Sequence, residues 1–455
     1  MGNARTEPWR LNRRRFLQLS LGSSALLVGC GDNGGGALGE GNGDGEGTAT
    51  SLTVPANESP WLSAYQEAAR TYGEQVDGEI TVREFPYDGL RTAMVNAIRG
   101  GTQPFDLFHM DEPWTGEFYD NEWAMPLTDI DSGFTLDQNI ITYDSLPTWN
   151  ADERRHAEDG EVMGLPINGN INIFIYRQDL YDELGLSVPT TFEEAYENGR
   201  IAQDRGAVRY GYVVRAQGTD SGQSIVYDYM PLMRAYGGDW YDENWQPAVN
   251  TPEGVAGMEM FQRLLSLGPP QPQTVGQAEV IAAMQGGQAL QVHVVAAAAP
   301  QFEDETASQV AGQLGYTKML AAETTGQSAP TSGVWSLALP RELPEDRARG
   351  AFDFINWLLS EEGQQAFTAA GGIPTRTELY DSTDVSEAAQ KYLPAIRDSL
   401  DDVRSSVRYP FSAEMLPVAE RSLASIAAGE TPVQEGLDEL ADELARIASE
   451  AGFGG

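Results

Sequence analysis

In the first part of the chain, short apolar runs alternate with amphipathic helical patterns. The runs at 51–57, 79–85 and 105–110 are typical of β-strands. Between them, apolar residues recur on one helical face at 61–72 and again at 90–98. Strand–helix–strand units place successive strands in parallel, with helices packed on the faces of the sheet. We therefore predict an α/β fold with a parallel sheet covered on both faces.

The middle of the chain continues this alternation. A strand-rich stretch that turns into a helix is predicted at 164–185, a further strand at 210–216, and a strand or buried segment at 289–298. Thr191 followed by Glu194 forms a capping box, which predicts a helix start at that point. The α/β class therefore extends over most of the chain.

The end of the chain becomes mainly helical. One last strand is predicted at 334–340. Helical patterns follow at 345–369, 386–401, 412–428 and 432–450. Their apolar stripes predict packing against a core, not a cofactor site.

The N-terminal residues have the pattern of an export signal. Arg13, Arg14 and Phe16 fit a twin-arginine motif and precede an apolar run that is too short to span a bilayer as a stable helix. The run ends in Leu-Val-Gly at Cys30, the only cysteine of the chain, in a segment that looks like a lipobox. We expect residues 1–30 to be a twin-arginine-type signal peptide with a lipobox, and Cys30 to be the lipid anchor. An N-terminal membrane helix is the alternative.

Residues 31–50 contain nine glycines and four acidic residues and almost no apolar side chains. A segment of this composition buries too little surface to fold, so we expect a flexible tether. No later stretch has the length and apolarity that predict a membrane-spanning helix.

The chain is strongly acidic. It carries 68 acidic and 29 basic residues, a net charge of −39, and its only lysines are Lys318 and Lys391. Nucleic-acid binding needs basic surface, so we expect no nucleic-acid partner. The acidic residues are spread along the chain, which favours a surface adapted to high salt and a halophilic source. An acidic patch for a cationic partner is the alternative.

Little in the sequence predicts catalysis. The three histidines are far apart and lack the i, i+4 partner of a helical zinc site. A G-x-G-x-x-G match at 34–39 lies in the glycine-rich tether, with no strand before it and no helix after it. Asp111 and Glu112 are adjacent, and neighbours on an extended strand point to opposite sides, which makes a poor acid/base pair. We therefore expect no enzyme activity, no cofactor and no metal.

Aromatic and polar side chains gather instead at predicted strand ends. Open α/β sheets bind ligands at the carboxyl ends of their strands. An aromatic face covers the apolar face of a sugar ring, while carboxylate, amide and guanidinium groups hydrogen-bond its hydroxyls. Side chains of these kinds are contributed by Asp111, Glu112, Trp114, Asn168, Asn170, Tyr236, Asp239, Trp240, Trp245 and Trp335.

Several of these residues lie in segments that resemble a known family. The segments include "PFDLFHMDEPWTGEFYDNEWAMPLTDI", "GLPINGNINIFIYRQDLYDELGLSVPTTFEEA", "AYGGDWYDENWQPAVNTPEGVAGMEMF" and "GGIPTR". In this order and spacing they resemble the extracellular solute-binding proteins of ABC sugar importers, the maltose-binding-protein-like group. The resemblance covers about 51–453.

The resemblance implies a two-lobed periplasmic-binding-protein-like fold with lobes that are discontinuous in sequence and a hinge between them. Lobe 1 would comprise 51–169 plus 331–374, and lobe 2 would comprise 170–330 plus 375–455. The hinge crossings would lie near three segments: 168–171, 328–332 and 373–377. Ligand would sit between the lobes and favour a closed form by contacting both.

The resemblance also implies a set of ligand-binding residues. They are Glu58, Tyr87, Asp111, Trp114, Asn168, Asn170, Asp239, Trp240, Gly333, Trp335 and Arg376. The three tryptophans would stack on the ligand, and the charged residues would hydrogen-bond it. The implied ligand is a sugar or oligosaccharide, with a polyol or glycerol phosphate as alternatives.

The resemblance further implies an exported monomer on the outer face of the cytoplasmic membrane. The lipid on Cys30 would hold it near the permease subunits of its ABC importer. Two other classes of function stay open. A secreted glycoside hydrolase would need two carboxylates across a cleft, such as Asp111 and Asp239. A surface adhesin or sensor would bind a polymer.

Overall fold

The computed structural model describes residues 49–218, 225–383 and 385–454. The predicted signal peptide, the lipobox with Cys30 and all but the last two residues of the predicted tether lie outside this part. In the described residues, no helix combines the length and the apolarity that crossing a membrane requires.

The first elements form where the sequence predicts them. β1 (Ser51–Asn57) pairs in parallel with β2 (Glu79–Phe85). The connecting helix α1 (Leu62–Gln75) buries its apolar face, and α2 (Tyr87–Arg99) follows β2. These elements follow directly from the local apolar pattern, which predicts two strands, each followed by an amphipathic helix.

A second group of strands corrects the expectation of a parallel sheet. β11 (Trp335–Pro340) lies between β3 (Phe108–Asp111) and β7 (Gly164–Asn168) and runs antiparallel to both. The short strand β4 (Ala124–Met125) also pairs antiparallel with β11. The pairs of this sheet are antiparallel because β11 enters from more than 150 residues further along the chain, in the opposite direction.

The other main sheet is antiparallel. β8 (Asn172–Arg177) lies between β9 (Gln291–Val295) and β10 (Leu314–Thr317). The prediction of a strand at 210–216 is wrong, because this segment makes only isolated bridges to the region of β9. Its ladder is interrupted because the amide of Gly211 donates to the carbonyl of Leu267 instead.

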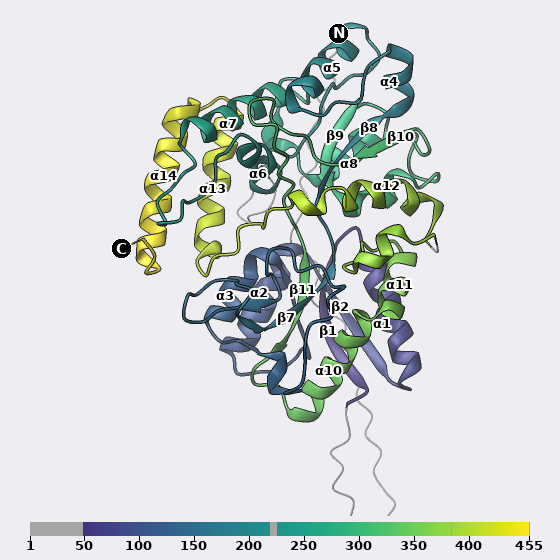
Figure 1. Ribbon diagram of the computed structural model, residues 1–455, viewed down its shortest axis with the longest axis vertical. Coiled ribbons are helices and arrows are strands. Elements are labelled where there is room, and N and C mark those ends of the chain that lie inside the picture. Colours follow the sequence, from purple (N-terminus) through teal and green to yellow (C-terminus); the bar gives the residue numbers. More distant parts are fainter. Residues whose placement is uncertain (1–48, 219–224, 384, 455) are drawn as a thin grey trace, which may run out of the picture. The chain divides into compact units, whose positions relative to one another are not determined.

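Helices cover both groups of strands (Figure 1). Those of the middle of the chain are α3 (Glu112–Asp120), α4 (Gln178–Leu184), α5 (Phe192–Asp204), α6 (Ile225–Ala235), α7 (Pro252–Leu265), α8 (Gln277–Gln285) and α9 (Ala299–Phe302). Two short strands, β5 (Thr148–Trp149) and β6 (Glu161–Val162), pair with each other. Thr191 caps α5 as predicted, accepting a hydrogen bond from the amide of Glu194 at 3.2 Å.

The helical end of the chain is also confirmed. It comprises α10 (Glu345–Leu358), α11 (Glu361–Ala369), α12 (Glu387–Arg397), α13 (Ser412–Ala427) and α14 (Val433–Glu450). The single helix predicted at 345–369 is two helices, because Ser360 leaves the helical path and its hydroxyl caps α11. Figure 1 shows α13 and α14 side by side.

Three segments connect the two groups of strands. Residues 169–171 lead from β7 to β8, and residues 318–334 lead from β10 to β11. Residues 370–386 lead from α11, which packs on α1, to α12, which packs on β10. The first two segments meet at a bridge between Ile171 and Ser332.

Candidate functional site

A cavity of about 320 Å³ lies where these connecting segments meet the strand ends. Asn57, Asp111 and Val295 are the last residues of β1, β3 and β9, and all three line the cavity. Trp335, the first residue of antiparallel β11, lines it as well. The wall is thus built from both groups of strands, as expected for a ligand site at carboxyl ends of strands.

Six of the predicted site residues line this cavity. They are Glu58, Tyr87, Asp111, Asn170, Gly333 and Trp335. Gly333 is required for the close packing here, since a Cβ at this position would stand 2.7 Å from the hydroxyl oxygen of Tyr227. The cavity therefore unites residues from five separate predicted segments.

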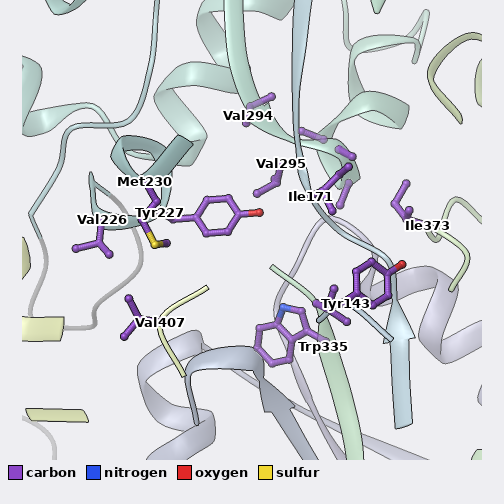
Figure 2. Packing of buried hydrophobic residues seen from close by; sticks show 14 of the residues in the cluster. Tyr143, Ile171, Val226, Tyr227, Met230, Val294, Val295, Trp335, Ile373 and Val407 are labelled. Carbon is purple, nitrogen blue, oxygen red and sulfur yellow. The ribbon is translucent and has the colours of Figure 1, made fainter. Parts of the chain in front are cut away.

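An aromatic cluster forms one side of the cavity. The ring of Trp335 makes edge contacts with Trp61 at 5.8 Å, Trp114 at 5.5 Å and Tyr87 at 6.1 Å between centroids. Tyr227, on helix α6, lines the cavity near Val295, the last residue of β9 (Figure 2). Such edge contacts fix the ring orientations and leave apolar faces for a solute.

Asp111 is the most tightly held carboxylate of the cavity. Its Oδ2 accepts a hydrogen bond from the hydroxyl of Tyr87 at 2.8 Å, and its Oδ1 caps α3 by accepting from the amide of Glu112 at 3.0 Å. The residue is 5% exposed. Burial raises the pKa of Asp111 to about 7, against the lowering effect of the Tyr87 hydrogen bond.

Arg215 is the one basic residue that lines the cavity in the described part of the chain. Its guanidinium binds the carboxylate of Asp228 through two hydrogen bonds of 2.8 and 2.6 Å. It also stacks over the ring of Tyr227 at 4.9 Å and donates to Gln277 at 3.3 Å. The Arg215 charge is therefore balanced within the protein.

Glu112 follows Asp111 directly but has different surroundings. Its carboxylate accepts from the hydroxyl of Ser332 at 2.7 Å and from the amide of Ser406 at 3.0 Å, and it pairs with Arg408 at 3.5 Å. Burial raises the pKa of Glu112 to about 7, while the Arg408 charge opposes this rise. Glu112 therefore binds both the connecting segment 318–334 and the residues just before α13, and it does not line the cavity.

Three predicted residues do not line this cavity. Trp240 has no exposed surface. Asn168 is also fully buried, and its Oδ1 accepts from the amide of Ile373 at 3.2 Å. Trp114 lies next to Trp335 but lines a neighbouring cavity of about 320 Å³, which shares Tyr87 with the first.

Two charged residues of the prediction are held by ion pairs away from the cavity. Asp239 pairs with Arg234 at 3.1 Å. Arg376, in the connecting segment 370–386, is buried and pairs with Asp137 at 2.9 Å and Glu378 at 2.6 Å. The Asp111–Asp239 pair considered for a hydrolase is thus not assembled in this cavity.

Sequence reasoning missed four prominent lining residues. They are Trp61, Arg215, Tyr227 and Gln277. Trp61 was assigned to the apolar face of a helix, although its position four residues after the end of β1 marks it as a strand-end residue. Arg215 follows the apolar run at 210–214, so its position also marks it as a residue at the end of a predicted strand. Tyr227 and Gln277 lie on helices, and nothing local in the sequence distinguishes them.

The histidines are structural in the described residues. His293 is bound between the Tyr212 hydroxyl at 2.7 Å and the Asp228 carbonyl at 2.9 Å. Burial lowers the pKa of His109 to about 3, so its ring is neutral. Among the described residues, no group of three or more His, Cys, Asp or Glu side chains is arranged to hold a metal ion.

Comparisons with known proteins agree with this geometry. The model of a family described as bacterial extracellular solute-binding protein matches residues 55–365. The mannitol-binding protein of Pseudomonas aeruginosa is 25% identical over 287 residues, which make up 62% of each chain. The chain thus spans less than two thirds of that relative's length.

Solved structures share the fold. A solute-binding protein of an ABC transporter from Agrobacterium radiobacter K84, in complex with ribitol, has a TM-score of 0.75 at 23% identity, covering 87% of this chain and 98% of that one. Maltose-bound MalE3 of T. maritima has a TM-score of 0.74 at 20% identity, covering 87% and 99%. The predicted two-lobed α/β fold is confirmed.

Proposed function

The chain belongs to the bacterial extracellular solute-binding proteins, and from this premise we propose that it captures a sugar or polyol in the cavity beside Trp335 and delivers it to an ABC importer. The observation that carries the proposal is the pairing of an aromatic wall with buried and exposed carboxylates at strand ends. The relatives described above bind mannitol, ribitol and maltose, all polyhydroxylated solutes.

The cavity suits such a solute chemically. The rings of Trp335 and Tyr227 offer apolar faces to the carbon skeleton. Asp111 and Glu58 accept hydrogen bonds from hydroxyl groups, and the side-chain amides of Asn170 and Gln277 lie in the same wall. A volume of about 320 Å³ is at the lower end of ligand pockets, which favours a small solute over a long oligosaccharide.

The solute would control the arrangement of two lobes. We assign lobe 1 to 51–169 plus 331–374 and lobe 2 to 170–330 plus 375–455, joined by the connecting segments described above. A solute that contacts Trp335 in one lobe and Tyr227 in the other stabilises whichever arrangement lets both contacts form. The permease subunits would then recognise that closed arrangement.

The remaining parts of the proposal concern place and assembly. The protein is exported and works as a monomer on the outer face of the membrane. The lipid on Cys30 and the glycine-rich segment after it hold the binding domain near the permease, which raises its effective concentration there.

The test is a binding screen on the purified full-length protein in multimolar salt. The melting temperature is recorded with a panel of monosaccharides, oligosaccharides and alditols. A solute that binds only the folded state stabilises it by about 2.7 kcal/mol at 100 times its Kd. We expect a selective increase with a small sugar or alditol, recovered chemically unchanged. Cleaved product would favour a hydrolase, and no increase with any member would contradict the proposal.

A further inference from the structure

Three donor groups that line the cavity, on Tyr87, Tyr227 and Arg215, are used within the protein. The hydroxyl of Tyr87 donates to Asp111 at 2.8 Å, and the hydroxyl of Tyr227 donates to a backbone carbonyl at 3.0 Å. The guanidinium of Arg215 is held by Asp228 through two hydrogen bonds. A solute in this cavity therefore finds few free donors among these groups.

Acceptors, in contrast, are left over. The carboxylate of Glu58 is exposed and makes no hydrogen bond or ion pair within the described residues. The side-chain oxygen of Asn57 is buried without a hydrogen-bond partner, although the residue is only 7% exposed and lines the cavity. A buried acceptor without a donor is costly, so a solute that donates here is favoured.

The charges of the cavity wall do not balance. Arg215 is paired with Asp228, and within the described residues no ion pair is formed by the carboxylates of Glu58 and Asp111. Neither lysine of the chain lines the cavity. Burial is the main cause that raises the pKa of Asp111 to about 7; the Glu112 charge also raises it, while the Tyr87 hydrogen bond and the more distant Arg215 charge lower it. A phosphate-bearing solute would add a third negative charge and is disfavoured.

We propose that the solute carries a protonated amine on a hydroxyl-bearing frame, as in an amino sugar or an amino alditol. This inference rests on the proposed function and narrows its solute class. The ammonium group binds beside Asp111 and Glu58, where it supplies both the missing charge and up to three donors. The aromatic faces of Tyr87 and Trp335 add a favourable environment for a cation.

The test compares matched pairs of solutes by titration calorimetry on the purified full-length protein at neutral pH, in the same multimolar salt as the binding screen. The pairs are glucosamine against glucose and 1-amino-1-deoxysorbitol against sorbitol. We expect the amine to bind about tenfold more tightly than its neutral partner in at least one pair, since a hydrogen bond to a charged group is roughly twice as strong as a neutral one. Equal or weaker binding of both amines would overturn the inference.

Variants locate the ammonium group. Asp111→Asn keeps a helix-capping side chain at the start of α3, so the fold is retained while the charge is lost. Asp111→Asn and Glu58→Gln are each expected to reduce the amine preference to below about threefold. Glu183→Gln, an exposed position on α4 outside the cavity, is the matched control and should keep the full preference. Full preference in both cavity variants would overturn the inference.

The outcomes for this inference and for the proposed function are separable. Binding of neutral sugars or alditols without an amine preference overturns only the inference. Failure of every sugar, alditol and amine to bind overturns both.

Discussion

Asp111 and Glu112 are neighbours in sequence, are both buried and both have a pKa raised to about 7, yet they lie in two different regions of the molecule. Asp111 belongs to the cavity wall, where its partners are the Tyr87 hydroxyl and a helix N-terminus. Glu112 belongs to a connector cluster of Ser332, Ser406 and Arg408. The comparison teaches that burial alone does not define a binding carboxylate. The difference is that Glu112 forms an ion pair with Arg408, whereas no ion pair of Asp111 is formed within the described residues.

The largest effect is expected from breaking the connector cluster. Arg408→Ala leaves the buried carboxylate of Glu112 without its cation and should lower the free energy of unfolding by about 3–5 kcal/mol. Denaturant unfolding measures the change. Arg446→Ala, which removes exposed ion pairs on α14, is the control and should change stability little. Equal stability of the Arg408 variant and the unaltered protein would refute the role of this cluster.

The pH dependence of stability should reveal Glu112 next. Its pKa is about 7 in the folded state against 4.5 for an unperturbed glutamate, so the folded state binds the proton more tightly. Raising the pH from 5 to 8 therefore destabilises the protein relative to Glu112→Gln, by roughly 3 kcal/mol. Melting curves of both proteins across this range measure the difference. A constant difference across the range would contradict the raised pKa.

A smaller effect is expected for solute binding at the cavity wall. Asp111→Asn removes a charged acceptor and should weaken binding of the identified solute by roughly 10- to 100-fold, because hydrogen bonds to charged groups contribute about 1.5–3 kcal/mol. Glu112→Gln is the matched neighbour and should change affinity by less than about threefold. Titration calorimetry compares the two. Equal losses in both variants would remove the distinction between the regions.

The smallest effect concerns the orientation of Asp111. Tyr87→Phe removes the hydroxyl that donates to the carboxylate and keeps the ring contacts with Trp114 and Trp335. We expect affinity to fall by roughly threefold to tenfold, in keeping with about 1 kcal/mol for one hydrogen bond. The same calorimetry measures it, and unchanged affinity would show that the hydrogen bond does not position Asp111 for the solute.

The sequence predicts the local elements well because their signals are local. β1, α1, β2 and α2 each have an apolar pattern of the right period within a few residues. The pairing of β11 between β3 and β7 has no such signal, since its partners lie more than 150 residues away. The antiparallel direction of these pairs could therefore be learned only from the structure.

The same distinction separates Trp335 from Trp240. Both follow glycine-containing segments and look alike in the sequence. Long-range pairing places Trp335 opposite Asp111 and Asn168 at the start of β11, which brings its ring to the cavity. Trp240 lacks such a partner and is buried in the core. Residue type alone made both tryptophans candidate ligand-binding residues. The pairing of β11 with distant strands determines that only Trp335 lines the cavity.

The central claim is tested most directly by a crystal structure of the full-length protein with the solute that binds most tightly in the screen. The account predicts solute atoms within hydrogen-bond distance of the Asp111 carboxylate and in contact with Trp335, while Glu112 stays bonded to Ser332. A larger cavity of about 520 Å³ lies beside Arg408, Tyr409 and Trp245. A solute bound there, or one that contacts Glu112 instead of Asp111, would contradict the account.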